Sequence, residues 1–349
     1  MLLLDYSLPN HLKGLSFESK NIRSFQPQDA SAQHDRTTTR YHYTSASALM
    51  AILGANNNNG AVRFTDARYM NDRSEHMYFV KLLLEYMEEH RLEYQYCQQV
   101  INKLLFEEQP YSLDDYLSLC VPELKDTKMG NYIYKKSRNF LFCLCKNSDS
   151  LHMWNYYIHS GNYQGYNLGI KTYSFLKNFD TTSIEENDPI RFYCGDVLYT
   201  DRKQKREIEV LCKTIERFGE RAGNYPDTLQ WAAAYLWQYI ECCGLFYKDK
   251  SFEDEEEYRI VIQFEGILAG SNISTYFKDV NRGIKYSFFE RNGILVPYLS
   301  VPLAKEAVTQ ITMAPIMENR IATLSMEEFL DANGYSEVDV MQSTIPIRF

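Results

Sequence analysis

The chain has 349 residues, of which 45% are hydrophobic and 14% aromatic, and its formal net charge is -9. This composition is sufficient for a sizeable folded core, whereas the acidic balance excludes a generally basic surface. A nucleic acid would therefore have to bind to a local basic patch.

No apolar run approaches the ~18 residues that a membrane span needs, and the N-terminal apolar run is too short for a signal peptide. Eight cysteines occur without the two-residue spacing of zinc ribbons and redox motifs, so no metal site is predicted. Free thiols without an export signal predict a cytoplasmic protein that does not contact membranes.

Residues 18–40 are polar and without periodicity, and we predict that residues 1–40 form an N-terminal arm. The folded part is predicted to begin with a strand at YHYTS (41–45), in which alternation places His42 on one face and its two tyrosine neighbours on the other. Thr44 or Ser45 can cap the helix that follows. His42 would then lie beside a helix N-terminus, which suits anionic groups, although a histidine buried in the core explains the pattern at least as well.

The middle of the chain alternates irregularly between short strands and helices. A strand at 61–65 is followed by a strongly helical stretch that begins near 74. The first clearly buried strand is 137–145, and SDSLHMWNYY (148–157) contains a capped helix. The next strand covers 166–171.

Two helical blocks are predicted at 202–221 and 226–246, before the clearest alternating strand at 255–264. This strand would carry Glu257 and Arg259 on one face and Tyr258 on the other, and we expect it to be half buried.

These elements predict an α+β fold, because helices of unequal length separate the strands without regular alternation. We expect a central mixed or antiparallel sheet, split-barrel-like, with inserted helical layers near 74–125 and 201–247. Residues 41–349 are predicted to form a single domain around this sheet.

Several fragments, in this order, resemble an uncharacterised bacterial family, the domain-of-unknown-function family 2971: YHYTSASALMAIL, VRFTDARYMNDRSE, FCLCKNSDSLHMWNYY, FEDEEEYRIV and QSTIPIR. The resemblance covers roughly residues 40–349. The chain departs from the usual pattern at Arg73, where proline is typical, and at Tyr258, where tryptophan is typical. Neither departure removes a catalytic type of residue, and the family name carries no function.

A strand histidine followed at once by a helix, with a late strand that opens with glutamate, more remotely resembles the ADP-ribosyltransferase fold. This resemblance implies that NAD is the substrate and that a carboxylate stabilises the positive charge that develops on ribose as nicotinamide leaves. It makes Glu257 the catalytic candidate. The candidates for contacts with NAD are His42 at the adenosine ribose, Arg63 at the pyrophosphate, Trp154, Tyr157 or Tyr166 against nicotinamide, and Tyr43 and Thr44 beside the histidine.

Under this hypothesis His42 and Glu257 face one cleft, with Trp154 or Tyr157 on its wall. The acceptor of ADP-ribose would be a macromolecule, either protein or nucleic acid. The protein would act as a toxin or phage-defence effector, and an inhibitory partner would be expected.

Each assignment has a simpler structural alternative. Glu257 and Arg259 could form a surface ion-pair ladder that contributes well under ~1 kcal/mol. Trp154 and Tyr157 would be core residues in most proteins, and Arg63 would face solvent. The chain would then be a non-catalytic nucleotide- or partner-binding module in which Glu257 is replaceable. A metal-dependent nuclease is a weaker third hypothesis, because it needs a further acid from another element.

Overall fold

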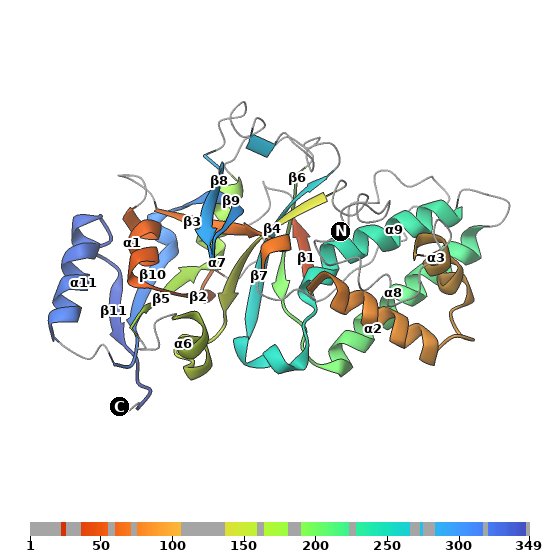
Figure 1. Ribbon diagram of the computed structural model, residues 1–349, viewed down its shortest axis with the longest axis horizontal. Coiled ribbons are helices and arrows are strands. Elements are labelled where there is room, and N and C mark those ends of the chain that lie inside the picture. Colours follow the sequence, from red (N-terminus) through yellow and green to blue (C-terminus); the bar gives the residue numbers. More distant parts are fainter. Residues whose placement is uncertain are drawn as a thin grey trace. The chain divides into compact units, whose positions relative to one another are not determined.

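A computed structural model of the protein describes 22–25, 36–54, 60–70, 75–105, 137–158, 164–180, 190–222, 228–265, 273–274, 283–316 and 320–346 (Figure 1). The chain divides into two compact units. Unit 1 comprises Met1–Ser24, Arg68–Arg138 and Tyr193–Glu253. Unit 2 comprises Phe25–Ala67, Asn139–Phe192 and Asp254–Phe349. Three strands cross the division: β1 (Ile22–Phe25), β4 (Ser137–Cys145) and β6 (Ile190–Asp196). The 3-10 helices η4 (Ala67–Tyr69) and η7 (Lys250–Glu255) cross it as well.

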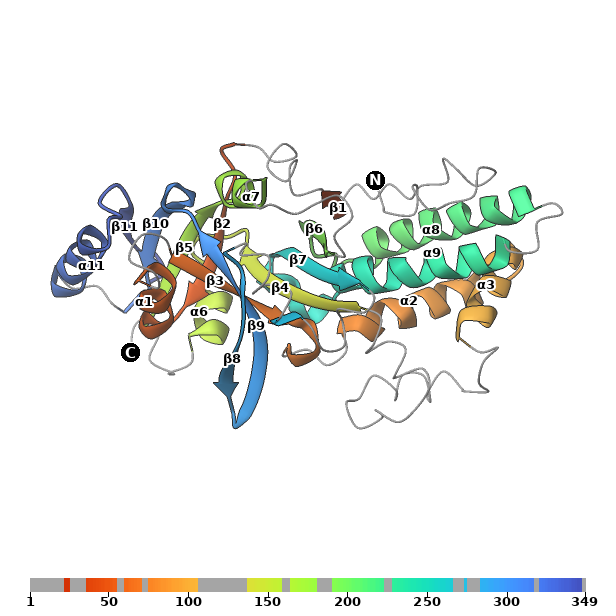
Figure 2. The same ribbon diagram turned by 90° about the horizontal axis from the view of Figure 1, so that it is seen from above.

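The described part of unit 1 is mainly helical. Its four α-helices lie alongside one another (Figure 2): α2 (Glu75–Glu89), α3 (Gln95–Leu105), α8 (Asp201–Ala222) and α9 (Thr228–Cys243). The longest helix, α8, has its charged residues between apolar residues that recur three or four positions apart. The buried apolar residues are Ile208, Leu211, Cys212, Ile215 and Phe218. The 3-10 helix η6 (Gly244–Phe246) follows α9. Helices therefore occupy both predicted insertions within the described residues, and 106–125 of the first insertion lies outside them.

Unit 2 is built on a mixed sheet that does not close into a barrel. One path through it follows the order β7-β4-β2-β5-β10-β11. The pairs β4–β2, β2–β5 and β5–β10 are antiparallel, and β10–β11 is parallel. The strands are β7 (Glu257–Glu265), β4 (Ser137–Cys145), β2 (Thr39–Thr44), β5 (Tyr166–Lys171), β10 (Val308–Met313) and β11 (Asp339–Gln342).

A second path leaves the sheet at β4 and contains β3 (Gly60–Asp66), β9 (Ile294–Leu303) and β8 (Lys285–Arg291), all antiparallel. The β8–β9 hairpin turns at Asn292 and Gly293, whose φ angles are 52° and 78°. Two successive positive φ angles are the requirement of a type I′ turn, which explains the Asn-Gly sequence. Figure 2 shows this hairpin as a long two-stranded projection.

The helices of unit 2 cover both faces of its sheet (Figure 1). On one face, α6 (Leu151–Tyr157) packs through Met153 and Trp154. On the other face, α7 (Thr172–Asp180) contributes Phe175, which packs against Phe64 and Phe142. The remaining helices are α1 (Ala46–Gly54), α11 (Arg320–Ala332) and the 3-10 helix η9 (Lys305–Ala307).

The mixed α+β sheet confirms the predicted fold class. The expected half-burial of β7 is wrong, because its polar face is buried as deeply as its apolar face: Arg259 and Ile260 are both 0% exposed. The predicted arm, residues 1–40, contains β1 and the start of β2, and most of it lies outside the described residues. Within the described ranges, no helix has the length and apolar character to cross a membrane.

Candidate functional site

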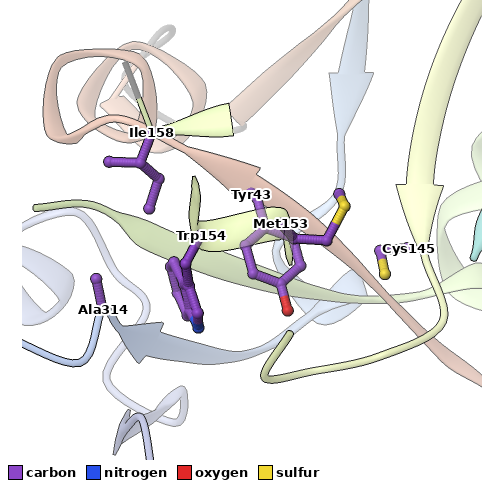
Figure 3. Close-up of a cluster of buried hydrophobic side chains, with 6 residues drawn as sticks. All are labelled: Tyr43, Cys145, Met153, Trp154, Ile158 and Ala314. Carbon is purple, nitrogen blue, oxygen red and sulfur yellow. The ribbon is translucent and has the colours of Figure 1, made fainter. Parts of the chain in front are cut away.

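The strand register decides which of the predicted site residues share a face of the sheet. Tyr41 pairs with Cys145 of β4 and with Gly169 of β5. Paired residues project from the same face, so Tyr41, Tyr43 and Cys145 lie together. Tyr43 packs edge-on against Trp154 of α6, with ring centroids 4.7 Å apart (Figure 3). We call this side of the sheet the α6 face.

His42 lies on the opposite face. Its ring is 5.1 Å from that of Phe142, and its Nδ1 lies 3.2 Å from the carbonyl oxygen of Cys143, which fits donation from an Nδ1–H tautomer. Burial lowers the pKa of His42 and outweighs the opposing effect of this carbonyl. The imidazole is therefore placed as a neutral group beside aromatic core residues.

Glu257 projects from the α6 face, away from His42. Arg40 shares the face of His42 by alternation, and its guanidinium lies 5.2 Å from the ring centroid of Tyr258. Tyr258 is consequently on the His42 face, and its neighbours in β7 point the other way. The expectation that His42 and Glu257 face one cleft is therefore wrong, because alternation fixes faces within a strand but not the register between strands.

The carboxylate of Glu257 is buried in an ion pair. Its Oε2 accepts a hydrogen bond of 2.8 Å from the guanidinium of Arg259, and the two residues are 5% and 0% exposed. The predicted surface ladder is therefore wrong as well. The ladder arrangement is present, but it lies inside the protein, where loss of one partner would leave an uncompensated charge.

Beside this pair, Tyr157 donates a hydrogen bond of 3.3 Å to Oε1 of Glu255. The pKa of Tyr157 is raised, first by burial and then by the nearby charges of Glu255 and Glu257. Glu256 between them has a φ angle of 42°, a left-handed conformation that is uncommon outside glycine. These groups form a cluster of carboxylates and a phenol that remains protonated.

Trp154 and Tyr43 are held in the core beneath α6. Trp154 is 0% exposed, and its indole N–H donates to Oδ1 of Asp149 at 2.7 Å. The hydroxyl of Tyr43 donates to the carbonyl of Asn147 at 2.9 Å and accepts from the backbone N–H of Ser150 at 2.8 Å. These environments are those of core residues rather than of a stacking platform for nicotinamide.

Thr44 and Tyr166 form a register pair at the end of β2 and β5. By alternation they share the face of His42, and both are buried, at 6% and 9% exposed. The predicted helix cap is supplied by Ser45, whose Oγ accepts from the N–H of Ala48 at 3.3 Å. Thr44 is therefore not the capping residue.

Arg63 lies apart, on an exposed surface of the second path of the sheet. Its guanidinium is 5.0 Å from the ring centroid of Phe289 and 5.2 Å from that of Tyr298. Ser300 of β9 pairs with Arg63 of β3 on one side and with Lys285 of β8 on the other. Tyr298 of β9 likewise pairs with Thr65 of β3 and with Ser287 of β8. We call this surface the Arg63 face; its polar, charged and aromatic residues are Arg63, Thr65, Lys285, Ser287, Phe289, Arg291, Tyr298 and Ser300. By register it also includes the apolar residues Ala61, Ile294, Val296 and Pro302.

No aspartate or glutamate of β3, β8 or β9, all of which are described, lies on the Arg63 face. Asp66 and Glu290 project from the other face by alternation. Of these residues only Arg63 was predicted from the sequence; Lys285, Phe289 and Tyr298 were not. Their strands were recognisable, and alternation within KYSFFER groups the lysine with Phe289, but pairing with β3 across more than two hundred residues leaves no local signal.

No group of three or more histidine, cysteine or acidic side chains within the described ranges is arranged to hold a metal ion. The described cysteines are free thiols, most of them buried. Cys143 and Cys145 alternate along β4 and project from the α6 face.

Residues 153–260 match the model of a family described as a protein of unknown function, DUF2971. The chain is thus similar to this family from α6 to the start of β7, a shorter stretch than the fragments predicted. No curated protein and no solved structure matches the chain.

Proposed function

We propose that this protein is a nucleotide-binding module whose ligand is recognised on the Arg63 face, without chemistry at Glu257. The observation that carries the proposal is the exposed guanidinium of Arg63 held against two aromatic rings. A guanidinium can donate to phosphate oxygens in a bidentate manner, and its planar surface can stack on a base.

The surroundings of Arg63 favour an anionic ligand. Lys285 lies on the same face, two strands away in the row that contains Ser300. Three hydroxyl side chains supply neutral hydrogen-bond partners: Thr65, Ser287 and Ser300. A local cationic surface on a chain of net charge -9 is the kind of patch that such a ligand requires.

The environment of Glu257 supports binding over catalysis. A transferase carboxylate must reach the ribose, whereas the carboxylate of Glu257 is buried and bonded to Arg259. His42, the proposed anchor for NAD, is on the other face of the sheet. ADP-ribosyl transfer to a macromolecule, with a toxin or defence role, stays a prediction that only an assay of turnover decides.

Thermal unfolding with ATP, ADP-ribose or NAD tests the proposal, since a ligand that binds only the folded state raises the apparent stability, by about 2.7 kcal/mol at a hundredfold excess over Kd. We expect a shift with the parent and none with Arg63→Gln. Arg320→Gln, which removes an exposed arginine from α11, should retain the shift. Absence of any shift at millimolar ligand with the parent would overturn the proposal.

A second assay separates binding from transfer. Purified protein is incubated with NAD, and released nicotinamide is measured. The binding module releases none above background. Release that falls by ~100-fold or more in Glu257→Gln, in a variant that remains folded, would instead identify the transferase and overturn the non-catalytic proposal.

A further inference from the structure

We infer that the ligand of the Arg63 face is single-stranded nucleic acid rather than a lone mononucleotide. This inference rests on the proposed function and adds the identity of the ligand. It follows from how far the cationic and aromatic residues extend along the strands.

The Arg63 face extends further along the strands than one nucleotide can contact. Lys285, Phe289 and Arg291 follow one another along the same side of β8. At ~3.4 Å per residue, the six steps from Lys285 to Arg291 span roughly 20 Å. Arg63 lies two strands away from Lys285 in the same row across the sheet. Cations therefore occur at both ends of this side of β8 and beside its Lys285 end.

Aromatic rings lie among these cations. The rings of Phe289 and Tyr298 are 5.7 Å apart and nearly perpendicular, at 67°. Both are partly exposed. Proteins that bind single strands combine a positive groove along the backbone with aromatic side chains and arginines that stack on bases, and this combination tolerates many sequences.

The geometry also selects against a duplex. Bases in a double helix are stacked on one another and unavailable to rings on a sheet surface, whereas a single strand can splay its bases. Charge complementarity together with ring stacking favours nucleic acid over an acidic protein, because cations next to exposed rings match a chain of bases joined by phosphates.

The experiment is fluorescence anisotropy with labelled oligo-dT and oligo-U of 4, 8 and 16 nucleotides, a duplex of 16 base pairs, and competition by ATP. We expect the affinity for single strands to rise from 4 to 8 nucleotides and to exceed that for the duplex. Phe289→Leu and Tyr298→Leu should each weaken binding at least about fivefold. Comparison of oligo-U with oligo-dU, which differ only in the 2′-hydroxyl, identifies the preferred sugar.

Salt dependence gives a second measurement. If Arg63, Lys285 and Arg291 neutralise three phosphates, log Kobs should fall with log salt with a slope of about -2, and Arg63→Gln should reduce the slope by about 0.7. Arg320→Gln should leave both affinity and slope unchanged. Circular dichroism and thermal unfolding establish that each variant is folded.

The failures of the two proposals are distinguishable. If ATP binds through Arg63 but oligonucleotides bind no more tightly as they lengthen, or the duplex binds equally well, the single-strand inference is wrong and nucleotide binding stands. If neither ATP nor oligonucleotides bind, both proposals fall. Binding that survives Phe289→Leu, Tyr298→Leu and Arg63→Gln unchanged also overturns the inference.

Discussion

Arg40 lies over the ring of Tyr258, with its guanidinium carbon 5.2 Å from the ring centroid. Because Arg40 shares the face of His42, this contact places Tyr258 on that face too. Glu257, the neighbour of Tyr258 in β7, therefore projects from the α6 face. Two polar residues that a catalytic hypothesis needs together are separated by the sheet itself. The buried polar residues of unit 2 therefore contribute first to the stability of the fold.

Glu257→Gln should destabilise the protein. The substitution removes the charge that Glu257 places against the buried guanidinium of Arg259, and loss of one member of a buried pair costs about 3–5 kcal/mol. Urea unfolding followed by tryptophan fluorescence measures the loss. The double variant Glu257→Leu, Arg259→Met should recover most of it, because it removes both charges.

The matched control for this pair is Glu209→Gln, which breaks the exposed pair between Glu209 and Lys213 on α8. Its cost should stay below about 0.5 kcal/mol. A cost for Glu257→Gln no greater than that of Glu209→Gln would mean that the buried pair is not a structural requirement.

Asp149→Ala should loosen the C-terminal segment. Oδ1 of Asp149 accepts from Trp154 Nε1 and from the hydroxyl of Ser343, each at 2.7 Å. Oδ2 accepts from the backbone N–H of Thr344 at 2.8 Å. Hydrogen bonds to a charged group contribute about 1.5–3 kcal/mol each, so we expect a loss of at least about 2 kcal/mol.

Hydrogen exchange at the amide of Thr344 provides the specific readout, since this N–H loses its acceptor in Asp149→Ala. Asp331→Ala is the control: its carboxylate accepts from the hydroxyl of Ser336 at 2.7 Å, away from this segment. Unchanged protection of Thr344 in Asp149→Ala would show that the aspartate does not hold the chain end.

His42 should make the protein less stable as the pH falls. The folded pKa lies below the ordinary value of 6.5, so the unfolded chain binds the proton first. Stability is then fully present above about pH 6.5 and decreases as the pH falls below it. His42→Gln should lose less stability between pH 7 and pH 5 than the parent, as measured by urea unfolding at each pH. Parallel pH dependences would refute the assignment.

Alternation along single strands was predictable. Tyr41 and Tyr43 against His42, and Glu257 and Arg259 against Tyr258, are correctly grouped because side chains in a strand alternate. Which group of one strand shares a face with which group of the other was not predictable, because it depends on the register between β2, β4 and β7. The sequence contains no local signal for that register, and a shift of one residue would reverse the conclusion.

The Arg63 face illustrates the same limit. A solvent-facing strand residue was the default expectation for Arg63, and it is exposed. Its aromatic neighbours come from a hairpin more than two hundred residues later in the chain, so neither composition nor motif spacing could bring them together. The Asn-Gly turn was a usable local signal for that hairpin.

Photo-crosslinking with azido-ATP, followed by mapping of the labelled peptides, tests the central claim most directly. Nucleotide binding on the Arg63 face predicts labels in β3, β8 and β9 that unlabelled ATP competes away and that Arg63→Gln, but not Arg320→Gln, abolishes. Labels confined to α6 and β7, or labels that excess ATP does not reduce, would contradict it.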